Sequence, residues 1–188
     1  MEVEKAIEVL KNGGVVVYPT ETLYGLGANI ADEFAVGKVE GIKGREGIPI
    51  SIAVTREEIG KYAYISELAK KIIDEFLPGP LTLLLKKKIT VPRWISETDF
   101  VGIRVPENEI AYDIVSGFGA ITSTSANVTG QAPPVSFSEI GKDVLDKADF
   151  AIDDGETKYK GSSTIVRVTD TVEVVREGVF DAGKLEGI

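Results

Sequence analysis

The chain has 188 residues, 21 of them basic and 30 acidic, for a formal net charge of −9, and it contains neither cysteine nor histidine. The missing cysteines exclude disulfides, thiolate nucleophiles and cysteine-bound metal centres; the missing histidines exclude Ser-His-Asp triads and imidazole acid–base catalysis. Residues 1–94 carry 13 basic and 13 acidic side chains, whereas residues 95–188 carry 8 and 17, so the overall charge argues against a protein that wraps nucleic acid.

The first half of the chain is predicted to alternate between helices and strands. Apolar residues at helical spacing predict a helix over 32–43, with Phe34, Val39 and Ile42 as candidate core contacts, and Ser66 is a typical N-cap. In chain order we predict a helix over 3–11, a strand over 15–18, the helix over 32–43, a strand over 49–55, a helical turn over 56–61, a helix over 66–76 and a strand over 81–85 that continues into Lys86-Lys87-Lys88.

The second half continues the alternation and predicts the fold class. We expect strands over 101–105, 120–123, 150–152, 163–168 and 172–175, and helices over 109–115 and 138–148. The last two strands can pair as a hairpin across 169–171, and the spacing of the other strands is irregular. These features predict a single α/β domain over residues 1–188, built on one open, twisted, mixed β-sheet with helices packed on it.

Two observations bear on localisation. No window approaches the roughly 20 consecutive apolar residues that a membrane helix needs. The first four residues, Met1-Glu2-Val3-Glu4, are acidic where a signal peptide would be basic. We therefore expect a cytoplasmic protein with no membrane partner.

Four polar clusters follow predicted strands or helices, at places where open α/β sheets commonly bind ligands. The stretch Tyr18–Gly27 combines hydroxyls with a proline and glycines and could bind a ligand, although its composition alone favours a turn capped by its threonines. Lys43 and Arg45 would share a face if the chain leaves the helix extended, which suggests a clamp for phosphate or carboxylate; the alternative is a solvated helix end.

The other two clusters lie in the second half. Five of the six residues in Thr122–Asn127 can form hydrogen bonds through their side chains, and leaving several of them buried and unpaired would cost about 1–3 kcal/mol each. Arg104 stands in an apolar strand and is grouped with Ser162-Ser163-Thr164 and Arg176. Arg104 requires a partner, which is either an anionic ligand or one of the many acids in the same half.

Two further charged runs have simpler interpretations. Lys86-Lys87-Lys88 is predicted to be a solvated sheet edge that discourages strand pairing, with RNA contact as the minor alternative. Asp153-Asp154-Gly155-Glu156 lacks the ligand spacing of a calcium loop and is predicted to be a turn, so no residue set is expected to bind a metal directly. A Walker phosphate loop is absent from the sequence.

Taken in order, the motifs resemble a known family. They read YPTETLYGLG at 18–27, KGR at 43–45, LPGPLTL at 77–83, GIRVP at 102–106, TSTSANVTG at 122–130, Ser163-Thr164, and VREG at 175–178. This arrangement resembles the YrdC-like family of threonylcarbamoyl-AMP synthases over about residues 5–180. Each motif is weak alone, but their number and order are specific.

The resemblance implies an activity. Members of the family convert L-threonine, bicarbonate and ATP to threonylcarbamoyl-AMP and pyrophosphate, which makes them nucleotidyltransferases that supply the t6A modification of tRNA. ATP is then a substrate, and Mg²⁺ would be bound mainly through its phosphates. Possible further partners are tRNA and the proteins that use the product. Such chemistry depends on positioning and charge neutralisation, so a chain without histidine or cysteine loses little.

The resemblance also assigns roles to residues. Lys43 and Arg45 match the catalytic and ATP-binding K-x-R pair. Ser125 and Asn127 match an S-x-N pair at the phosphates and the carbamate, and Pro133 and Arg176 match nucleotide contacts. The positions expected to hold L-threonine are Thr22, Arg104, Ser123 and Ser163, with Arg104 on the carboxylate.

The sequence departs from the family pattern in two places. Relatives often read KGRPxxNPL with a histidine a few residues on, whereas this chain reads KGREGIPI, one residue shorter, with Ala53 near the histidine position. One ATP contact and one threonine contact are therefore expected to differ. The second departure is that the additional C-terminal domain of longer relatives is expected to be absent, so we expect the short, single-domain form of the enzyme.

Two alternative functions remain open from the sequence. One is a non-catalytic module that binds tRNA or double-stranded RNA, which predicts an affinity that falls steeply with salt. The other is an adenylating enzyme of the same fold that depends on carbamoyl phosphate in place of threonine and bicarbonate.

Overall fold

A nine-stranded sheet forms the centre of the computed structural model, which describes all residues from 1 to 188. The strand order is β7-β1-β2-β6-β3-β5-β4-β8-β9. Parallel pairs (β1 with β7, β3 with β5, β4 with β8) are mixed with antiparallel ones, so the predicted mixed α/β sheet is confirmed. The strands are β1 (Val16–Tyr18), β2 (Gly25–Gly27), β3 (Ser51–Ala53), β4 (Leu81–Lys86), β5 (Phe100–Arg104), β6 (Ile121–Ser125), β7 (Phe150–Ala151), β8 (Thr164–Val168) and β9 (Val172–Arg176).

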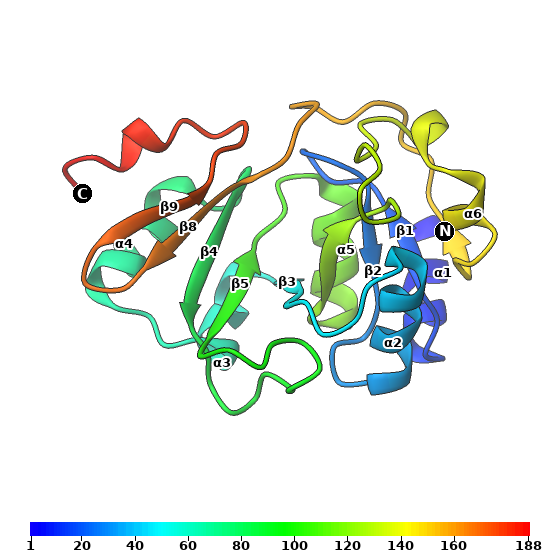
Figure 1. The fold of residues 1–188 in the computed structure, drawn as a ribbon, viewed down its shortest axis with the longest axis horizontal. Coiled ribbons are helices and arrows are strands. Elements are labelled where there is room, and N and C mark those ends of the chain that lie inside the picture. Colours follow the sequence, from blue (N-terminus) through cyan, green and yellow to red (C-terminus); the bar gives the residue numbers. More distant parts are fainter.

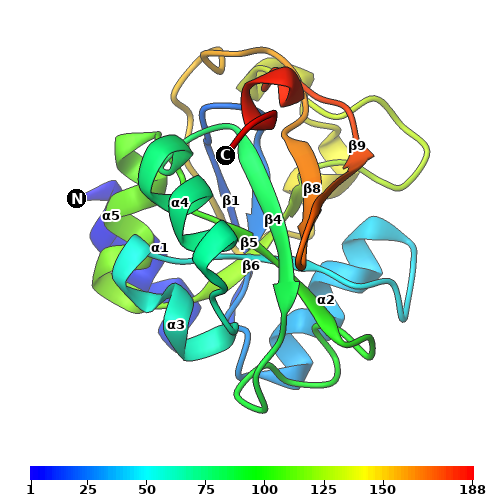
Figure 2. The same ribbon diagram turned by 90° about the vertical axis from the view of Figure 1, so that its left-hand side faces the viewer.

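Helices cover both faces of the sheet (Figure 1). Figure 2 shows α1, α4 and α5 on one side of the strands and α2 on the other. The helical elements are α1 (Glu2–Lys11), α2 (Glu33–Lys43), η1 (Arg56–Glu58), α3 (Ile59–Tyr62), α4 (Glu67–Phe76), α5 (Glu109–Phe118), η2 (Phe137–Glu139), α6 (Lys142–Leu145) and η3 (Ala182–Leu185). None of these helices is both long and apolar enough to cross a membrane.

Helix α2 shows how the local sequence sets element boundaries. The Asp32 carboxylate accepts hydrogen bonds from the backbone N–H groups of Phe34 and Ala35, which caps the first turn. Gly44 ends the helix in the left-handed conformation at φ 64°, a region that favours glycine. The predicted helix over 32–43 is therefore confirmed at both ends, and the buried stripe of α2 delivers Lys43 to the sheet.

Two predictions about helices were wrong in detail. Phe34 was expected in the core but is 87% exposed, because it lies beside the stripe of buried residues that includes Val36 and Val39. The helix predicted over 138–148 is broken into η2 and α6, since Ile140 is extended (ψ 124°) and Gly141 follows it in an extended conformation (ψ 140°).

The lysine run at the end of β4 is not a sheet edge, which corrects a third prediction. Strand β4 lies between β5 and β8, and Lys86 pairs with Phe100 in the ladder. The Lys87 ammonium donates to the Ser96 carbonyl, and the Lys88 ammonium donates to the Gly60 carbonyl. Two of the three lysines therefore tie neighbouring loops to the strand.

Strand β6 places a polar sequence in the middle of the sheet, between β2 and β3. Thr122 is fully buried, and its hydroxyl donates to the Leu26 carbonyl and accepts from the Ala28 N–H. This threonine is a structural bridge to β2. The hydroxyl groups beyond it, at the end of β6, face the site described next.

Candidate functional site

Lys43 occupies the last turn of α2 and is only 3% exposed. Its ammonium donates to the Ser125 carbonyl at 2.6 Å, to the Ser125 hydroxyl at 3.1 Å and to Asn127 Oδ1 at 3.1 Å. The partners are neutral oxygens, so they position the ammonium without cancelling its charge. Burial, and then repulsion from the nearby Arg45, lower the pKa of Lys43 to about 8.

Arg45 reaches the same site although the chain does not leave the helix in the extended conformation considered from the sequence. The left-handed turn at Gly44 separates the two cations and redirects the chain, so the shared face comes from a helix cap. One guanidinium nitrogen of Arg45 lies 3.4 Å from the Thr124 hydroxyl at the end of β6. Lys43 and Arg45 thus contact adjacent residues of one strand.

Asn127 organises the turn after β6. Its amide nitrogen donates to the carbonyls of Val128 at 2.9 Å and Gln131 at 2.8 Å. Its amide oxygen then faces the Ser125 hydroxyl at 2.5 Å and the Lys43 ammonium. The S-x-N pair and the first cation of K-x-R are therefore one hydrogen-bonded unit.

The loop from Thr20 to Tyr24 forms a second wall. The Thr20 hydroxyl accepts from the N–H groups of Thr22 and Leu23 and lies 2.9 Å from the Thr22 hydroxyl. Thr22 in turn lies 3.4 Å from a guanidinium nitrogen of Arg104, at the end of β5. This contact brings two positions 82 residues apart to one wall.

Arg104 is 7% exposed and forms a buried ion pair with Glu21. The alternative prediction, an acid from the second half of the chain, was wrong about the source of the partner. Arg104 is nevertheless not used up by this pair, because it also faces the site and its Nε has no hydrogen-bond partner.

A third wall comes from β4, β8 and β9. The hydroxyls of Ser163 and Thr82 lie 2.8 Å apart, and Arg176 donates to the Ser163 carbonyl at 2.7 Å and to its hydroxyl at 3.2 Å. Burial, and then the charge of Arg104, lower the pKa of Arg176. The positive charges of the two arginines therefore repel each other across the site.

All three walls enclose one cavity of about 360 Å³. The charged side chains that line it are four cations, Lys43, Arg45, Arg104 and Arg176. The structure brings together every residue that the sequence singled out for the site, namely Thr22, Lys43, Arg45, Arg104, Ser123, Ser125, Asn127, Pro133, Ser163 and Arg176. In a chain of net charge −9, this is a local concentration of positive charge suited to a polyanion.

The chain is similar in sequence to several known proteins. The family model for Sua5, YciO and YrdC, described as "Telomere recombination", matches residues 8–178. The chain belongs to the Sua5/YciO/YrdC family. A relative named putative threonylcarbamoyl-AMP synthase, from Methanocaldococcus jannaschii, is 46% identical over 191 residues, which cover 98% of this chain and 91% of the relative.

Solved structures of Sua5/YciO/YrdC members have the same fold. The complex of Pyrococcus abyssi Sua5 with L-threonine superposes with a TM-score of 0.94 at 34% identity, covering 98% of this chain and 57% of Sua5. This chain therefore spans little more than half the length of that protein. Escherichia coli YciO gives a TM-score of 0.86 at 30% identity and covers 96% of this chain and 90% of YciO.

Four further lining residues have no individual role predicted from the sequence. Ser162 and Thr124 belong to polar clusters that the sequence singles out, and Thr82 lies in the LPGPLTL motif, whereas Ser51 was not foreseen at all. Thr82 carries a readable signal, because it is the one hydroxyl in the otherwise aliphatic run Leu81–Leu85. Ser51 carries none: its hydroxyl occupies space that exists because residue 102, on the neighbouring strand, is glycine.

Proposed function

We propose that this protein is a threonylcarbamoyl-AMP synthase, which joins L-threonine, bicarbonate and ATP to give threonylcarbamoyl-AMP, pyrophosphate and water. The observation that carries the proposal is a cavity whose charged lining groups are all cations and whose remaining polar groups are mainly hydroxyls. Such a lining suits a triphosphate next to an amino acid. Several relatives bear the name threonylcarbamoyl-AMP synthase, and the two alternative functions have no comparable support.

The ATP phosphates are proposed to bind at the unit formed by Lys43, Arg45, Ser125 and Asn127. These residues are tied together by the end of β6, so the positive charges are held in place before the ligand arrives. Preorganised cations stabilise the charge that moves from the α-phosphate to the leaving pyrophosphate. Arg176 and the main chain near Pro133 complete the nucleotide side of the proposed site.

L-threonine is proposed to bind against Thr22, Arg104, Ser123 and Ser163, with its carboxylate on Arg104. The Pyrococcus abyssi relative has been solved with L-threonine bound, which supports an amino acid site in this fold. The hydrogen bonds of Arg176 to Ser163 connect this side of the cavity to the nucleotide side. Both substrates would therefore lie within one cavity.

The chemistry follows from this placement. The threonine amine attacks CO₂ formed from bicarbonate, which releases water and yields a carbamate after loss of a proton. A carbamate oxygen then attacks the α-phosphorus in line, the bond to the β-phosphate bridging oxygen breaks, and pyrophosphate leaves with the electron pair. The substrates supply both nucleophiles, so the protein contributes positioning and positive charge.

Mg²⁺ is proposed to enter with the nucleotide. The cavity offers the metal no carboxylate, and its charged lining groups would repel a free cation. Phosphate oxygens and water are then the ligands that suit Mg²⁺ here. We place the reaction in the cytoplasm and expect the labile product to pass to a protein that transfers the threonylcarbamoyl group to tRNA.

A pyrophosphate-release assay tests the proposed function. We expect release from ATP that requires both L-threonine and bicarbonate. Replacing both with carbamoyl phosphate should abolish release, and tRNA should not be needed. Pyrophosphate release that is indifferent to threonine, or salt-dependent tRNA binding without ATP turnover, would contradict the proposal.

A further inference from the structure

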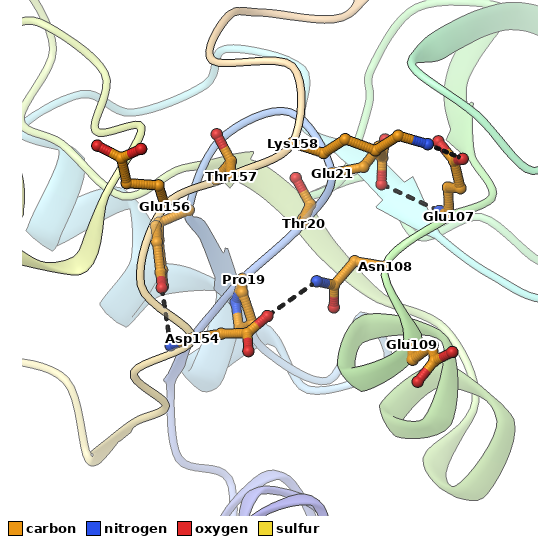
Figure 3. A pocket seen from close by; sticks show the side chains of 11 residues that line it. Pro19, Thr20, Glu21, Glu107, Asn108, Glu109, Asp154, Glu156, Thr157 and Lys158 are labelled. Atoms are coloured by element: carbon orange, nitrogen blue, oxygen red, sulfur yellow. Dashed lines mark hydrogen bonds and ion pairs between the residues drawn. The ribbon is translucent and has the colours of Figure 1, made fainter.

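Glu21 is a buried carboxylate behind the wall of the substrate cavity. Only 2% of the residue is exposed, and its partner Arg104 is 7% exposed. It also lines a second cavity, together with Thr20, Glu107 and others (Figure 3). Burying two charges costs free energy that their attraction does not reliably return, so a buried ion pair is weak support for a purely stabilising role.

The hydrogen bonds of Arg104 are incomplete in a specific way. A guanidinium has five N–H donors. One terminal nitrogen donates to Glu21 and lies 3.5 Å from the Thr22 hydroxyl, and the other lies 3.4 Å from the same hydroxyl. Nε–H is buried and has no partner, and the second terminal nitrogen contacts only the Thr22 hydroxyl. Arg104, which lines the substrate cavity, therefore keeps unused hydrogen-bonding capacity.

Glu21 is itself held from the outside. Its second oxygen accepts the backbone N–H of Glu107 at 3.0 Å, and its carbonyl accepts the N–H of Tyr159 at 2.9 Å. The Glu107 carboxylate is bound by Lys158 at 2.6 Å and by the Tyr159 hydroxyl at 2.9 Å. Figure 3 shows Glu21 next to Glu107, with the Lys158 side chain extending past Glu21 to reach the Glu107 carboxylate.

Glu21 also resolves an electrostatic conflict. Arg104 shares its cavity with Lys43, Arg45 and Arg176, and that cavity has no acid among its lining residues. A long, flexible cation in such surroundings is pushed away from the other positive charges. A fixed anion directly behind it pins the guanidinium at one place.

We propose that Glu21 is a positioning residue, which fixes the Arg104 guanidinium so that it receives the carboxylate of the amino acid substrate. The inference rests on the proposed function, since it assumes that an amino acid binds there. Glu21 contacts no substrate in this proposal and acts only through Arg104.

Glu21 could change the affinity for a carboxylate in two opposite ways. Glu21 is negative. If its only effect were to offset the positive charge of Arg104, its removal would tighten the binding of a carboxylate. If it orients Arg104, its removal weakens binding, because the guanidinium loses its fixed partner and the substrate must order it. The sign of the change therefore separates the two effects.

The test compares two ligands on the Glu21→Gln variant by calorimetric titration. L-threonine carries the carboxylate, and L-threoninol, in which a CH₂OH group replaces it, does not. We expect the dissociation constant of L-threonine to rise by about tenfold or more, which corresponds to the loss of one charge-assisted contact. The constants for L-threoninol and ATP should change less than about twofold, since neither depends on this contact.

The matched control is Glu107→Gln, because the Glu107 side chain contacts Lys158 and Tyr159 but only its backbone N–H reaches Glu21. This control should leave the affinity for L-threonine unchanged. If Glu21→Gln does not fold, Glu21→Asp decides, since it keeps the charge but shortens the reach. The same selective loss for L-threonine is then expected.

Three results would overturn the inference: unchanged or tighter L-threonine binding, equal losses for threonine and threoninol, or an equal loss in the Glu107→Gln control. Failure of the proposed function looks different. The unsubstituted protein would then release no pyrophosphate in response to threonine, whatever the variants do.

Discussion

At the scale of single residues, Lys43 and Arg45 are the cations on which the proposed catalysis depends most. Substitution of either by alanine removes a cation whose position is fixed by the end of β6. We expect the rate of threonine-dependent pyrophosphate release to fall at least about 100-fold, as for other preorganised charge stabilisers. Lys86→Ala, at an exposed lysine outside the cavity, is the control and should keep near-normal activity. Near-normal rates in either cavity variant would remove that residue from the proposed role.

The pKa of Lys43 predicts a pH dependence for ATP binding. In the free protein this pKa is lowered to about 8, so the ammonium loses its proton as the pH rises past that value. ATP then has to restore the proton, and its dissociation constant should rise above pH 8, approaching about tenfold per pH unit. Titrations in buffers of different ionisation enthalpy should show net proton uptake.

Lys43→Arg is the matched variant for this pH prediction, because a guanidinium stays charged over the whole range. Its affinity for ATP is expected to be weaker but flat above pH 8. A flat profile in the unsubstituted protein up to pH 9.5, or the same decline in the arginine variant, would show that Lys43 is not the titrating group.

Most of the residues that line the site could be predicted from the sequence, and a few could not. All ten expected site residues line one cavity, because motif order carried information that no single motif did. Glu21 was not foreseen, since nothing local connects it to Arg104, which lies 83 positions away. Ser51 was not foreseen for a similar reason, because the space for its hydroxyl depends on Gly102, a glycine in another strand.

At the scale of elements, the turn that joins α2 to Arg45 is the critical feature. Gly44 has φ 64°, and an added Cβ would meet only Val128 Cγ1 at 3.8 Å, so the conformation and not crowding requires glycine there. Gly44→Ala should lower the free energy of unfolding by about 1–2 kcal/mol and weaken ATP binding as Arg45 shifts. Urea unfolding and calorimetry measure the two effects.

Gly37→Ala provides the control within the same helix. Gly37 is exposed, its Cβ would meet nothing within 4 Å, and its backbone is helical. Alanine should therefore raise the free energy of unfolding by about 1 kcal/mol and leave ATP binding unchanged. If both variants move stability in the same direction, the left-handed turn does not have the importance assigned to it.

Element prediction succeeded where capping and periodicity agreed and failed elsewhere. Helix α4 begins at its predicted cap, Ser66, and helix α2 begins after Asp32, the first residue of the predicted range. Strand β2, Gly25–Gly27, was not predicted, because glycine is uncommon in strands and only pairing with β1 and β6 defines it. The predicted helix over 138–148 failed because tertiary context extends the chain at Ile140.

At the scale of the whole molecule, charge is segregated. The chain carries a net charge of −9, yet four cations and no acids are the charged groups that line the 360 Å³ cavity. The fold achieves this by bringing the C-terminal end of α2 together with the ends of β5 and β9, which carry Arg104 and Arg176. An acidic exterior around a cationic interior favours a small polyanion over a long nucleic acid.

The central claim is that ATP and L-threonine occupy this one cavity together, and a thermal-shift matrix tests it most directly. The unfolding midpoint is measured with each ligand alone and with both, for the unsubstituted protein, Lys43→Ala and Arg104→Ala. We predict stabilisation by each ligand and a larger joint shift than the two separate shifts add up to, with Lys43→Ala losing the ATP response and Arg104→Ala the threonine response. Independent shifts, or responses that survive both substitutions, would contradict the account.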